Sequence, residues 1–271
     1  MRGLVTIGSV KGAPGATTLA LRCAAELARR QPRGRHPVVL AECDTAGGDL
    51  APRLGLPGLP GIASLALGAR RGLDAGALAA HLQPVPGVAE LALLAGVAGP
   101  EQGAALTWML GDLGRLLAGL DATSVADVGR VRPGDPVVLE LLRDASLNLL
   151  VTSADAPSAL HVRAVAEGLR KQGVDVELVV VGRRPYAPRE MAGATGLHLL
   201  GWVHDLTERR RGADAPWRPW RSWLQDAAGD RDAAGDRVAR LVDDVSERVA
   251  ERGGEATDDH LRRGRGLEPA R

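Results

Sequence analysis

Short apolar runs alternate with longer stretches of helical periodicity along most of the chain. The apolar runs fall at residues 4–7, 37–42, 88–94, 123–128, 147–152, 176–181 and 197–203. Such runs are typical of strands that are buried on both faces of a parallel sheet. The stretches with helical spacing lie between them, at residues 19–30, 62–69, 74–82, 101–120, 137–143, 156–172 and 189–194. This alternation predicts an α/β fold, a doubly wound, mainly parallel sheet with flanking helices.

The pattern changes after residue 205. The segment from Arg209 to Trp223 is rich in Arg and Trp, and Pro216 and Pro219 interrupt any continuous helix through it. Its indoles either pack the last helices onto the sheet or form a docking surface for a protein partner, a membrane surface or DNA. An amphipathic helix then closes the chain. We expect one domain over residues 1–252 and a polar, disordered tail over residues 253–271.

Composition narrows the class of protein. The chain has 271 residues and a formal net charge of +1, which gives no global reason to expect nucleic acid or an acidic membrane as a partner. Cys23 and Cys43 are isolated, as in proteins of a reducing cytoplasm. No apolar run approaches the roughly 20 residues that span a bilayer. We therefore expect a cytoplasmic protein, at most peripheral to the inner face of the membrane.

Two classes of enzyme are excluded by motif. The histidines are scattered without paired metal-ligand spacing, and no nucleophile-elbow pattern is present, so the sequence does not indicate a metal hydrolase or a serine hydrolase.

In the predicted helix at 101–120, Trp108 is expected in the core or at a subunit interface.

The loop between the first strand and the first helix is the most informative stretch. It consists of Lys11, Gly12, Ala13, Pro14, Gly15, Ala16, Thr17 and Thr18. A strand, a tight glycine loop and a helix bring backbone N–H groups and the helix N-terminus onto one anion. The full phosphate-binding pattern requires Lys at the position of Ala16. The structural alternative is a strand–turn–helix in which Thr17 and Thr18 only cap the helix.

Lys11 argues for the phosphate site. It is one of two lysines among 34 basic residues of this chain, the other being Lys171. A lysine placed four residues before Gly15, in a chain that otherwise uses Arg, indicates that the loop needs a compact ammonium group there.

The loop resembles the deviant Walker A P-loop of the MinD/ParA ATPases, whose pattern is Lys-Gly-Gly-x-Gly-Lys-[Ser/Thr]-Thr. The resemblance continues through the strand and polar loop at residues 39–54, through Asp127 at a strand end, and through the strands and helices at residues 147–205. It implies a P-loop NTPase fold that binds ATP and Mg²⁺ and forms a homodimer. Relatives organise chromosomes, plasmids, division sites, pili or flagella in space.

The resemblance also implies roles for single residues. Lys11 would reach the nucleotide of the partner subunit, and the loop residues from Lys11 to Thr18 would bind nucleotide. Thr17 would coordinate Mg²⁺, Asp44 would position the attacking water, and Asp127 would hold Mg²⁺, usually through water. Arg183 stands where the family places a loop that contacts the base. From the residues alone, the alternative role for Asp44 is a turn cap, and Asp121 or Asp135 competes with Asp127.

Ala16 leaves two functions open. A charge-assisted hydrogen bond contributes roughly 1.5–3 kcal/mol, about 10- to 150-fold in affinity, so nucleotide binding survives more readily than hydrolysis, which needs the charge where it develops in the transition state. The sequence favours a slow Mg²⁺-dependent ATPase that acts as a dimeric switch. The alternative is a non-hydrolysing adaptor that localises pilus, secretion or division machinery.

Overall fold

The computed structural model describes residues 2–11, 15–32, 38–69, 72–204 and 233–264. Within these ranges the chain forms an eight-stranded sheet with the order β3-β4-β2-β5-β1-β6-β7-β8. The strands are β1 (Gly3–Ser9), β2 (Val38–Glu42), β3 (Gln83–Pro84), β4 (Leu91–Leu94), β5 (Thr123–Arg130), β6 (Leu147–Ser153), β7 (Glu177–Val181) and β8 (Leu199–Val203). All pairings are parallel except that of β3 with β4.

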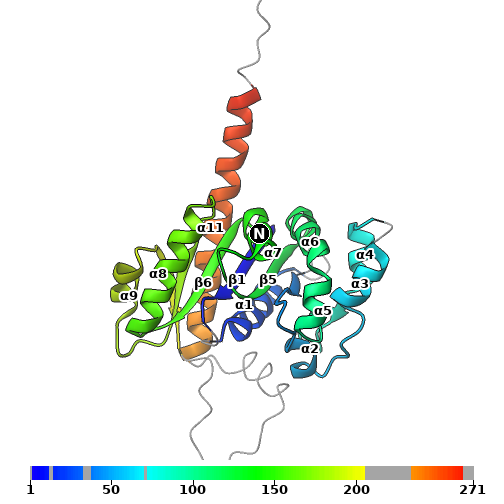
Figure 1. The fold of residues 1–271 in the computed structure, drawn as a ribbon, viewed down its shortest axis with the longest axis horizontal. Coiled ribbons are helices and arrows are strands. Elements are labelled where there is room, and N and C mark those ends of the chain that lie inside the picture. The colour runs from blue at the N-terminus through cyan, green and yellow to red at the C-terminus, as the bar shows by residue number, and fades with distance from the viewer. Residues whose placement is uncertain (1, 12–14, 33–37, 70–71, 205–232, 265–271) are drawn as a thin grey trace, which may run out of the picture.

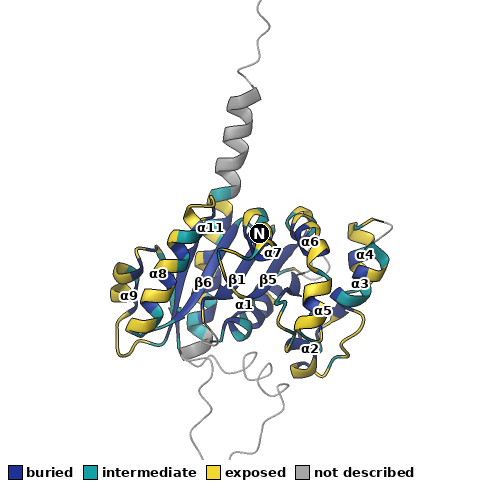
Figure 2. Cartoon of the chain, viewed as in Figure 1, coloured by how far each residue is buried: buried dark blue, intermediate teal, exposed yellow. Residues whose placement is uncertain are grey.

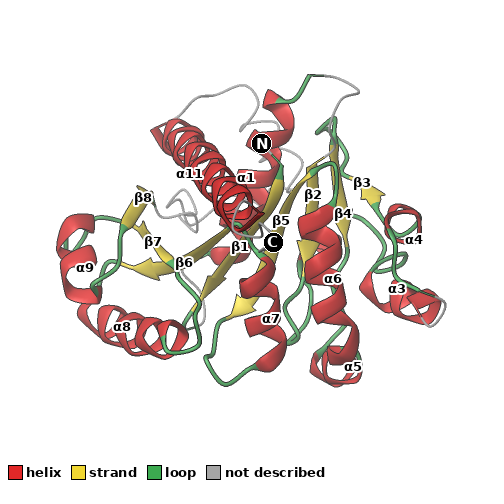
Figure 3. Cartoon of the chain, turned by 90° about the horizontal axis from the view of Figure 1, so that it is seen from above, coloured by secondary structure: helices red, strands yellow, loops and turns green. Residues whose placement is uncertain are grey.

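Helices cover both faces of the sheet (Figures 1 and 3). They are α1 (Ala16–Arg30), α2 (Leu50–Arg53), α3 (Ile62–Ala69), α4 (Ala75–Ala79), α5 (Pro100–Ala105), α6 (Thr107–Gly119), α7 (Pro136–Asp144), α8 (Ala156–Arg170), α9 (Pro188–Thr195) and α11 (Ala233–Gly264). Helices α1 and α11 lie on one face, and α6, α7 and α8 lie on the other. Each face has its own apolar core, and Figure 2 shows the buried sheet between them. This confirms the predicted doubly wound, mainly parallel fold.

The expected helix at 101–120 is two helices. Helices α5 and α6 meet at Leu106, whose φ of −108° and ψ of 5° end the first helix and begin the second. Helix α5 packs against the loop after β2, where a Cβ on Gly103 would overlap the carbonyl oxygen of Thr45. Trp108 is 54% exposed, so it does not lie in the core, and its alternative place at a subunit interface stays a prediction. The amphipathic pattern of α6 is satisfied by other residues, such as Met109 and Leu113.

Other differences concern the ends of elements. The sequence analysis missed the short strand β3, and the strand expected from Val88 begins at Leu91. Helix α11 continues to Gly264, which places helix where the first part of a disordered tail was expected. The division of the chain into a domain and a tail stays a prediction. None of the helices described here is long and apolar enough to cross a membrane.

A buried carboxylate fastens α11 to the sheet. Glu177, the first residue of β7, is 3% exposed. Its Oε1 accepts hydrogen bonds from Arg248 Nε at 2.8 Å and from Arg252 Nη2 at 2.9 Å, and His198 Nδ1 lies 3.0 Å from its Oε2. Both arginines belong to α11, so this cluster sets the position of the helix along the sheet.

Strand order decides which loops meet. Because β5 lies between β1 and β2, the loops that follow these three parallel strands lie at the same edge of the sheet. That edge is where ligands bind in open α/β sheets.

Candidate functional site

The N-terminus of α1 is open to an anion. Gly15 precedes the helix with φ of 88°, a left-handed conformation that glycine adopts without strain, and no side chain caps the helix there. The first N–H groups of an uncapped helix have no intrahelical partner, and they bind negatively charged groups. Three of the expected nucleotide-binding residues, Gly12, Ala13 and Pro14, lie outside the described residues.

Thr17 and Asp127 meet at this terminus. Their side chains are hydrogen-bonded to each other, and Asp127 Oδ1 also accepts the N–H of Gly129 at 3.0 Å. Asp127 is 1% exposed. The pKa of its carboxyl is raised from 3.8 to about 6, mainly because burial removes the water that would solvate the charge. The hydrogen bonds from Thr17 and Gly129 lower the pKa, and the nearby Glu42 and Asp44 raise it.

The competing aspartates lie elsewhere. Asp121 forms an exposed ion pair with Arg2, and Asp135 caps α7 through the N–H groups of Val137 and Val138. Of the three candidates, only Asp127 contacts Thr17. Thr18 lies beside α2, where Arg53 Nη1 is 3.5 Å from its hydroxyl.

Asp44 is half-buried and approaches the same point. Its Oδ1 accepts the N–H of Ala46 at 2.8 Å, so it does cap a turn, as the structural alternative required. Its Oδ2 lies against Gly129, where a Cβ would overlap it. Gly129 also has φ of 59°, so glycine is needed there for two reasons. Burial raises the pKa of Asp44, with Arg132 opposing the shift. Turn cap and site residue are thus compatible roles.

Glu42 is a residue that the sequence analysis missed. It ends β2, is 2% exposed, and its Oε1 accepts the N–H groups of Asp49 and Leu50, the latter at 2.8 Å. Its Oε2 accepts the N–H of Gly96 at 3.1 Å. Burial raises the pKa of its carboxyl, and the backbone hydrogen bonds oppose the shift. Glu42 therefore fixes the loop that carries Asp44. An acidic residue at the end of a wholly buried strand was the available signal.

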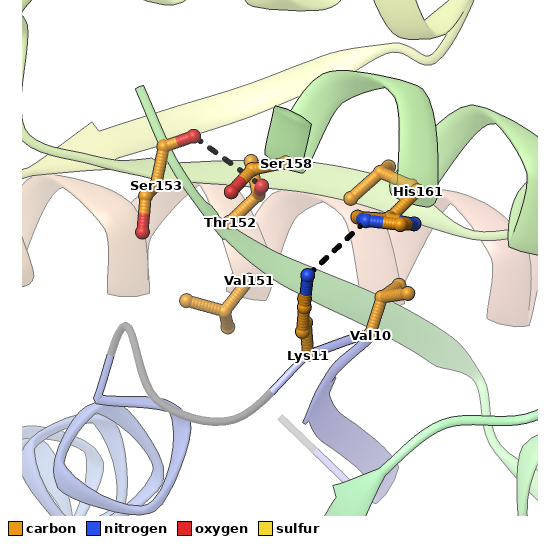
Figure 4. A pocket seen from close by; sticks show the side chains of 8 residues that line it. Val10, Lys11, Val151, Thr152, Ser153, Ser158 and His161 are labelled. Atoms are coloured by element: carbon orange, nitrogen blue, oxygen red, sulfur yellow. Dashed lines mark hydrogen bonds between the residues drawn. The ribbon is translucent and has the colours of Figure 1, made fainter. Parts of the chain in front are cut away.

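Lys11 turns toward α8 of its own chain. Its Nζ lies 3.3 Å from Nε2 of His161, at a cavity of about 80 Å³ lined also by Thr152, Ser153 and Ser158 (Figure 4). Lys11 is exposed, and its ammonium group contacts neither Thr17 nor Asp127. Its expected reach into a partner subunit stays a prediction.

Arg183 lies apart from this group. It is exposed at the end of β7, with its guanidinium 4.8 Å from the ring centre of Trp202 on β8, and Arg237 of α11 lies 4.0 Å from the same ring. No contact within the described ranges joins Arg183 to Thr17, Asp44 or Asp127. Its expected contact with a nucleotide base stays a prediction.

The oxygen ligands at the site fit Mg²⁺ shared with a phosphate. Thr17 offers a hydroxyl and Asp127 a carboxylate, both at an uncapped helix N-terminus. The described residues hold no group of three or more His, Cys, Asp or Glu side chains placed to bind a metal. Mg²⁺ commonly keeps several waters and takes one or two protein oxygens plus substrate phosphates, so this small donor set suits a metal–nucleotide complex rather than a protein-only metal site.

Comparison with solved structures identifies the fold. A ParA family ATPase from Chlorobium tepidum is 17% identical, with 89% of this chain and 97% of that chain covered and a TM-score of 0.71. The cell division ATPase MinD of Pyrococcus furiosus is 16% identical, with 91% and 99% covered and a TM-score of 0.69. MinD of Pyrococcus horikoshii, complexed with Mg-ADP, is 15% identical, with 93% and 99% covered and a TM-score of 0.70.

At these identities the likeness concerns the fold. The chain has the fold of the MinD and ParA P-loop ATPases over nearly its whole length. No protein-family model and no curated protein matches its sequence.

Proposed function

We propose that the protein binds ATP with Mg²⁺ at the ends of β1, β2 and β5 and acts as a nucleotide-dependent homodimer. The observation that carries this proposal is the hydrogen-bonded pair of Thr17 and a buried Asp127 beside the uncapped N-terminus of α1. A site of this kind combines backbone N–H donors for phosphate with oxygen ligands for a hard cation. The Mg-ADP complex of the Pyrococcus horikoshii protein supports it by analogy of fold.

Each residue has a distinct task in this proposal. The N-terminus of α1 binds the phosphates, and Thr17 and Asp127 hold Mg²⁺. When bound, the metal would neutralise charge on the phosphates and on the group that leaves during hydrolysis. Asp44 orients water, while Glu42 keeps the loop of Asp44 in place through three backbone hydrogen bonds. Phosphoryl transfer needs such positioning and charge stabilisation more than covalent help.

Ala16 limits the rate of hydrolysis. Its side chain is 7% exposed and packs within the core on the α1 face, so this position supplies no cation to the phosphates. Without that cation, the negative charge that develops on the phosphoryl group in the transition state is less stabilised. We therefore propose slow turnover, with the ATP-bound dimer as the form that partners recognise.

The biological role proposed is spatial organisation. Structural neighbours include the MinC:MinD cell division complex of Aquifex aeolicus and a putative plasmid partition protein of Borrelia burgdorferi bound to AMPPNP. They support a role in placing DNA or division sites through a protein partner. The segment from Arg209 to Trp223, which the sequence marks as a candidate contact with membrane or DNA, lies outside the described residues.

A second function follows from Ala16 alone. If the missing cation abolishes hydrolysis, the protein is an adaptor that binds ATP, dimerises and localises pilus, secretion or division machinery without turnover.

Nucleotide binding and phosphate release test the proposal together. Purified protein titrated with ATP, with and without Mg²⁺, should bind more tightly with the metal, and Asp127→Ala should remove the difference. The matched control is Asp121→Ala, which removes an exposed carboxylate from the end of the α6–β5 connection. Ala16→Lys should raise ATP affinity or turnover by about 10- to 150-fold.

The outcomes separate three possibilities. Slow, Mg²⁺-dependent phosphate release supports the ATPase, and ATP-dependent dimerisation without release supports the adaptor. A protein that binds no nucleotide at millimolar concentration has only the fold of a P-loop ATPase, and that result would overturn both functions.

A further inference from the structure

A second hollow lies at the far end of the sheet from β3. It follows β8 between α9 and α11, which Figure 3 shows on opposite sides of that strand. Its volume is about 440 Å³, within the range of pockets that bind small molecules or side chains of a partner. We call it the β8 groove. It is separate from the Thr17–Asp127 site. Of its lining residues, only Arg183 has an expected role with the nucleotide, at the base, and the function proposed above gives the others no task.

The β8 groove is strongly basic. The described residues that line it include four arginines, Arg183, Arg189, Arg237 and Arg240, and one carboxylate, Asp244. Arg183 and Arg237 are held against the ring of Trp202, with guanidinium carbons 4.8 Å and 4.0 Å from its centre. Such stacking orients an arginine while leaving its N–H groups available to an anion.

Two of these arginines have no ion-pair partner among the described residues. Arg189 on α9 and Arg240 on α11 are exposed, and neither forms an ion pair with any residue that the structure describes. Nearby arginines of α11 differ in this respect, because Arg248 and Arg252 are paired with Glu177. Clustered, unpaired arginines repel one another, and a negatively charged occupant would relieve that cost.

The lining is partly apolar. Leu199, Leu200 and Pro188 contribute to it, together with the ring of Trp202. A duplex phosphate backbone or a lipid headgroup surface is broad and polar, and it would leave this concave apolar lining uncovered. An extended peptide places carboxylates and apolar side chains alternately, which matches both features of the groove.

The edge of β8 favours contact through side chains. Among the described strands, β8 pairs only with β7, and no described strand adds to its other edge. The register shifts between β7 and β8 at Leu178 and Val179, and such irregularities disfavour the addition of a further regular strand. Recognition would therefore rest on the arginines and on the apolar lining.

We propose that the β8 groove binds an extended acidic segment of a partner protein, with its carboxylates on Arg189, Arg240 and the two stacked arginines and an apolar side chain against Leu199 and Leu200. The nucleotide would then control dimerisation at one edge of the sheet, while cargo is held at the end of the sheet.

The probe is a fluorescent twelve-residue peptide of alternating acidic residues and leucine. Its binding to the full-length protein is followed by fluorescence anisotropy at low and at high salt. The double variant Arg189→Glu/Arg240→Glu should weaken binding by about 10- to 100-fold. The matched control Arg143→Glu/Arg170→Glu makes the same charge change on α7 and α8, outside the groove, and should bind as the original protein does.

Three results would overturn the proposal. They are absence of peptide binding at low salt, equal loss in both double variants, and equal binding of a peptide in which lysine replaces the acidic residues. A DNA duplex or phosphatidylglycerol vesicles that bind through Arg189 and Arg240, when the acidic peptide does not, would assign the groove to that ligand instead. ATP binding measured on the same samples shows whether the variants keep the nucleotide site, so a failure here is distinct from a failure of the proposed function.

Discussion

Asp127 places a titrating carboxyl in the core of the molecule. Its pKa is about 6 in the folded protein against an ordinary value of 3.8. A carboxyl whose pKa is raised by folding stabilises the protein while it is protonated in both states, below pH 3.8. That contribution is lost as the pH rises through about 6. The protein without ligand therefore keeps, at neutral pH, a charge that is costly to bury.

Asp127→Asn removes this titration. We expect the free energy of unfolding of the variant, relative to that of the original protein, to rise by about 2–3 kcal/mol between pH 4 and pH 7. Urea unfolding across that range measures it, and Asp121→Asn is the exposed control. With Mg²⁺ and ATP present the order should reverse, because the variant loses the stabilisation that bound ligand gives. A pH-independent difference would contradict the assigned pKa.

Gly129 gives a second prediction at the residue scale. Gly129→Ala introduces a Cβ that overlaps Asp44 Oδ2, at a residue whose φ is 59°. We expect a loss of about 1–3 kcal/mol in the free energy of unfolding, together with displaced Asp44 and slower turnover. Gly134→Ala is the control, since a Cβ there meets no atom within 4 Å. Equal effects of the two substitutions on unfolding by urea would disprove the close approach.

Single residues differ in how far the sequence predicts them. The sequence indicated Thr17 by its motif position and Asp127 by its place at a strand end, and their role as Mg²⁺ ligands stays a prediction. The choice among Asp121, Asp127 and Asp135 needed the register of β5 beside β1. Glu42 was missed because its backbone N–H partners cannot be read from the sequence, and its place at the end of a wholly buried strand was the one available signal. Arg183 and Trp202 come together because β7 pairs with β8. The residues around each of them in the sequence do not predict that pairing.

At the scale of elements, helix α11 depends on the cluster around Glu177. Arg248 and Arg252 of α11 donate hydrogen bonds to the buried carboxylate of Glu177, and His198 lies within hydrogen-bond distance of the same group. The amphipathic pattern of Val238, Leu241, Val242, Val245 and Val249 predicted the helix, and these residues are buried. The continuation of its backbone to Gly264 was not predicted, because a polar sequence rich in charged residues is equally typical of a solvent-exposed helix and of a disordered tail.

Glu177→Gln should loosen α11. The amide keeps the shape of the carboxyl but lacks the charge that two arginines share, so we expect Tm to fall by about 3–6 °C. Hydrogen exchange should increase in α11 more than in α8. Glu167→Gln, which alters an exposed ion pair with Arg163 on α8, is the control and should leave Tm nearly unchanged. Unaltered exchange in α11 would show that its apolar face alone holds it.

For the whole molecule, the alternation of buried strands and helices sufficed to predict the fold. Sheet order could not be derived from it, since any βαβ sequence is compatible with several orders of strands. Short elements such as β3 lie below the length at which periodicity is informative. The likeness to MinD and ParA structures at 15–17% identity shows that the same fold is reached by sequences that differ at most aligned positions.

The proposed ATP-dependent dimer gives a prediction at the scale of the whole molecule. Lys11→Ala should leave ATP binding by the monomer nearly intact and weaken the ATP-dependent dimer by about 10- to 150-fold, because Lys11 is proposed to act across subunits. Lys171→Ala, at the far end of α8, is the only other lysine substitution that the chain offers. Light scattering with and without ATP measures the fraction of dimer in the two variants, Lys11→Ala and Lys171→Ala. If the Lys11 variant dimerises as the original protein does, Lys11 does not act across subunits, and its contact with His161 within the chain is its remaining role.

The contact between Gly103 and Thr45 has a mechanical consequence. With no space for even a methyl group between α5 and the loop after β2, the two surfaces are in direct backbone contact. A nucleotide that displaces Asp44 would push Thr45 against α5, and through α5 against α6, where the indole of Trp108 faces solvent. Occupancy of the proposed phosphate site would thus be transmitted to the outer surface of the molecule, and the fluorescence of Trp108 would report it.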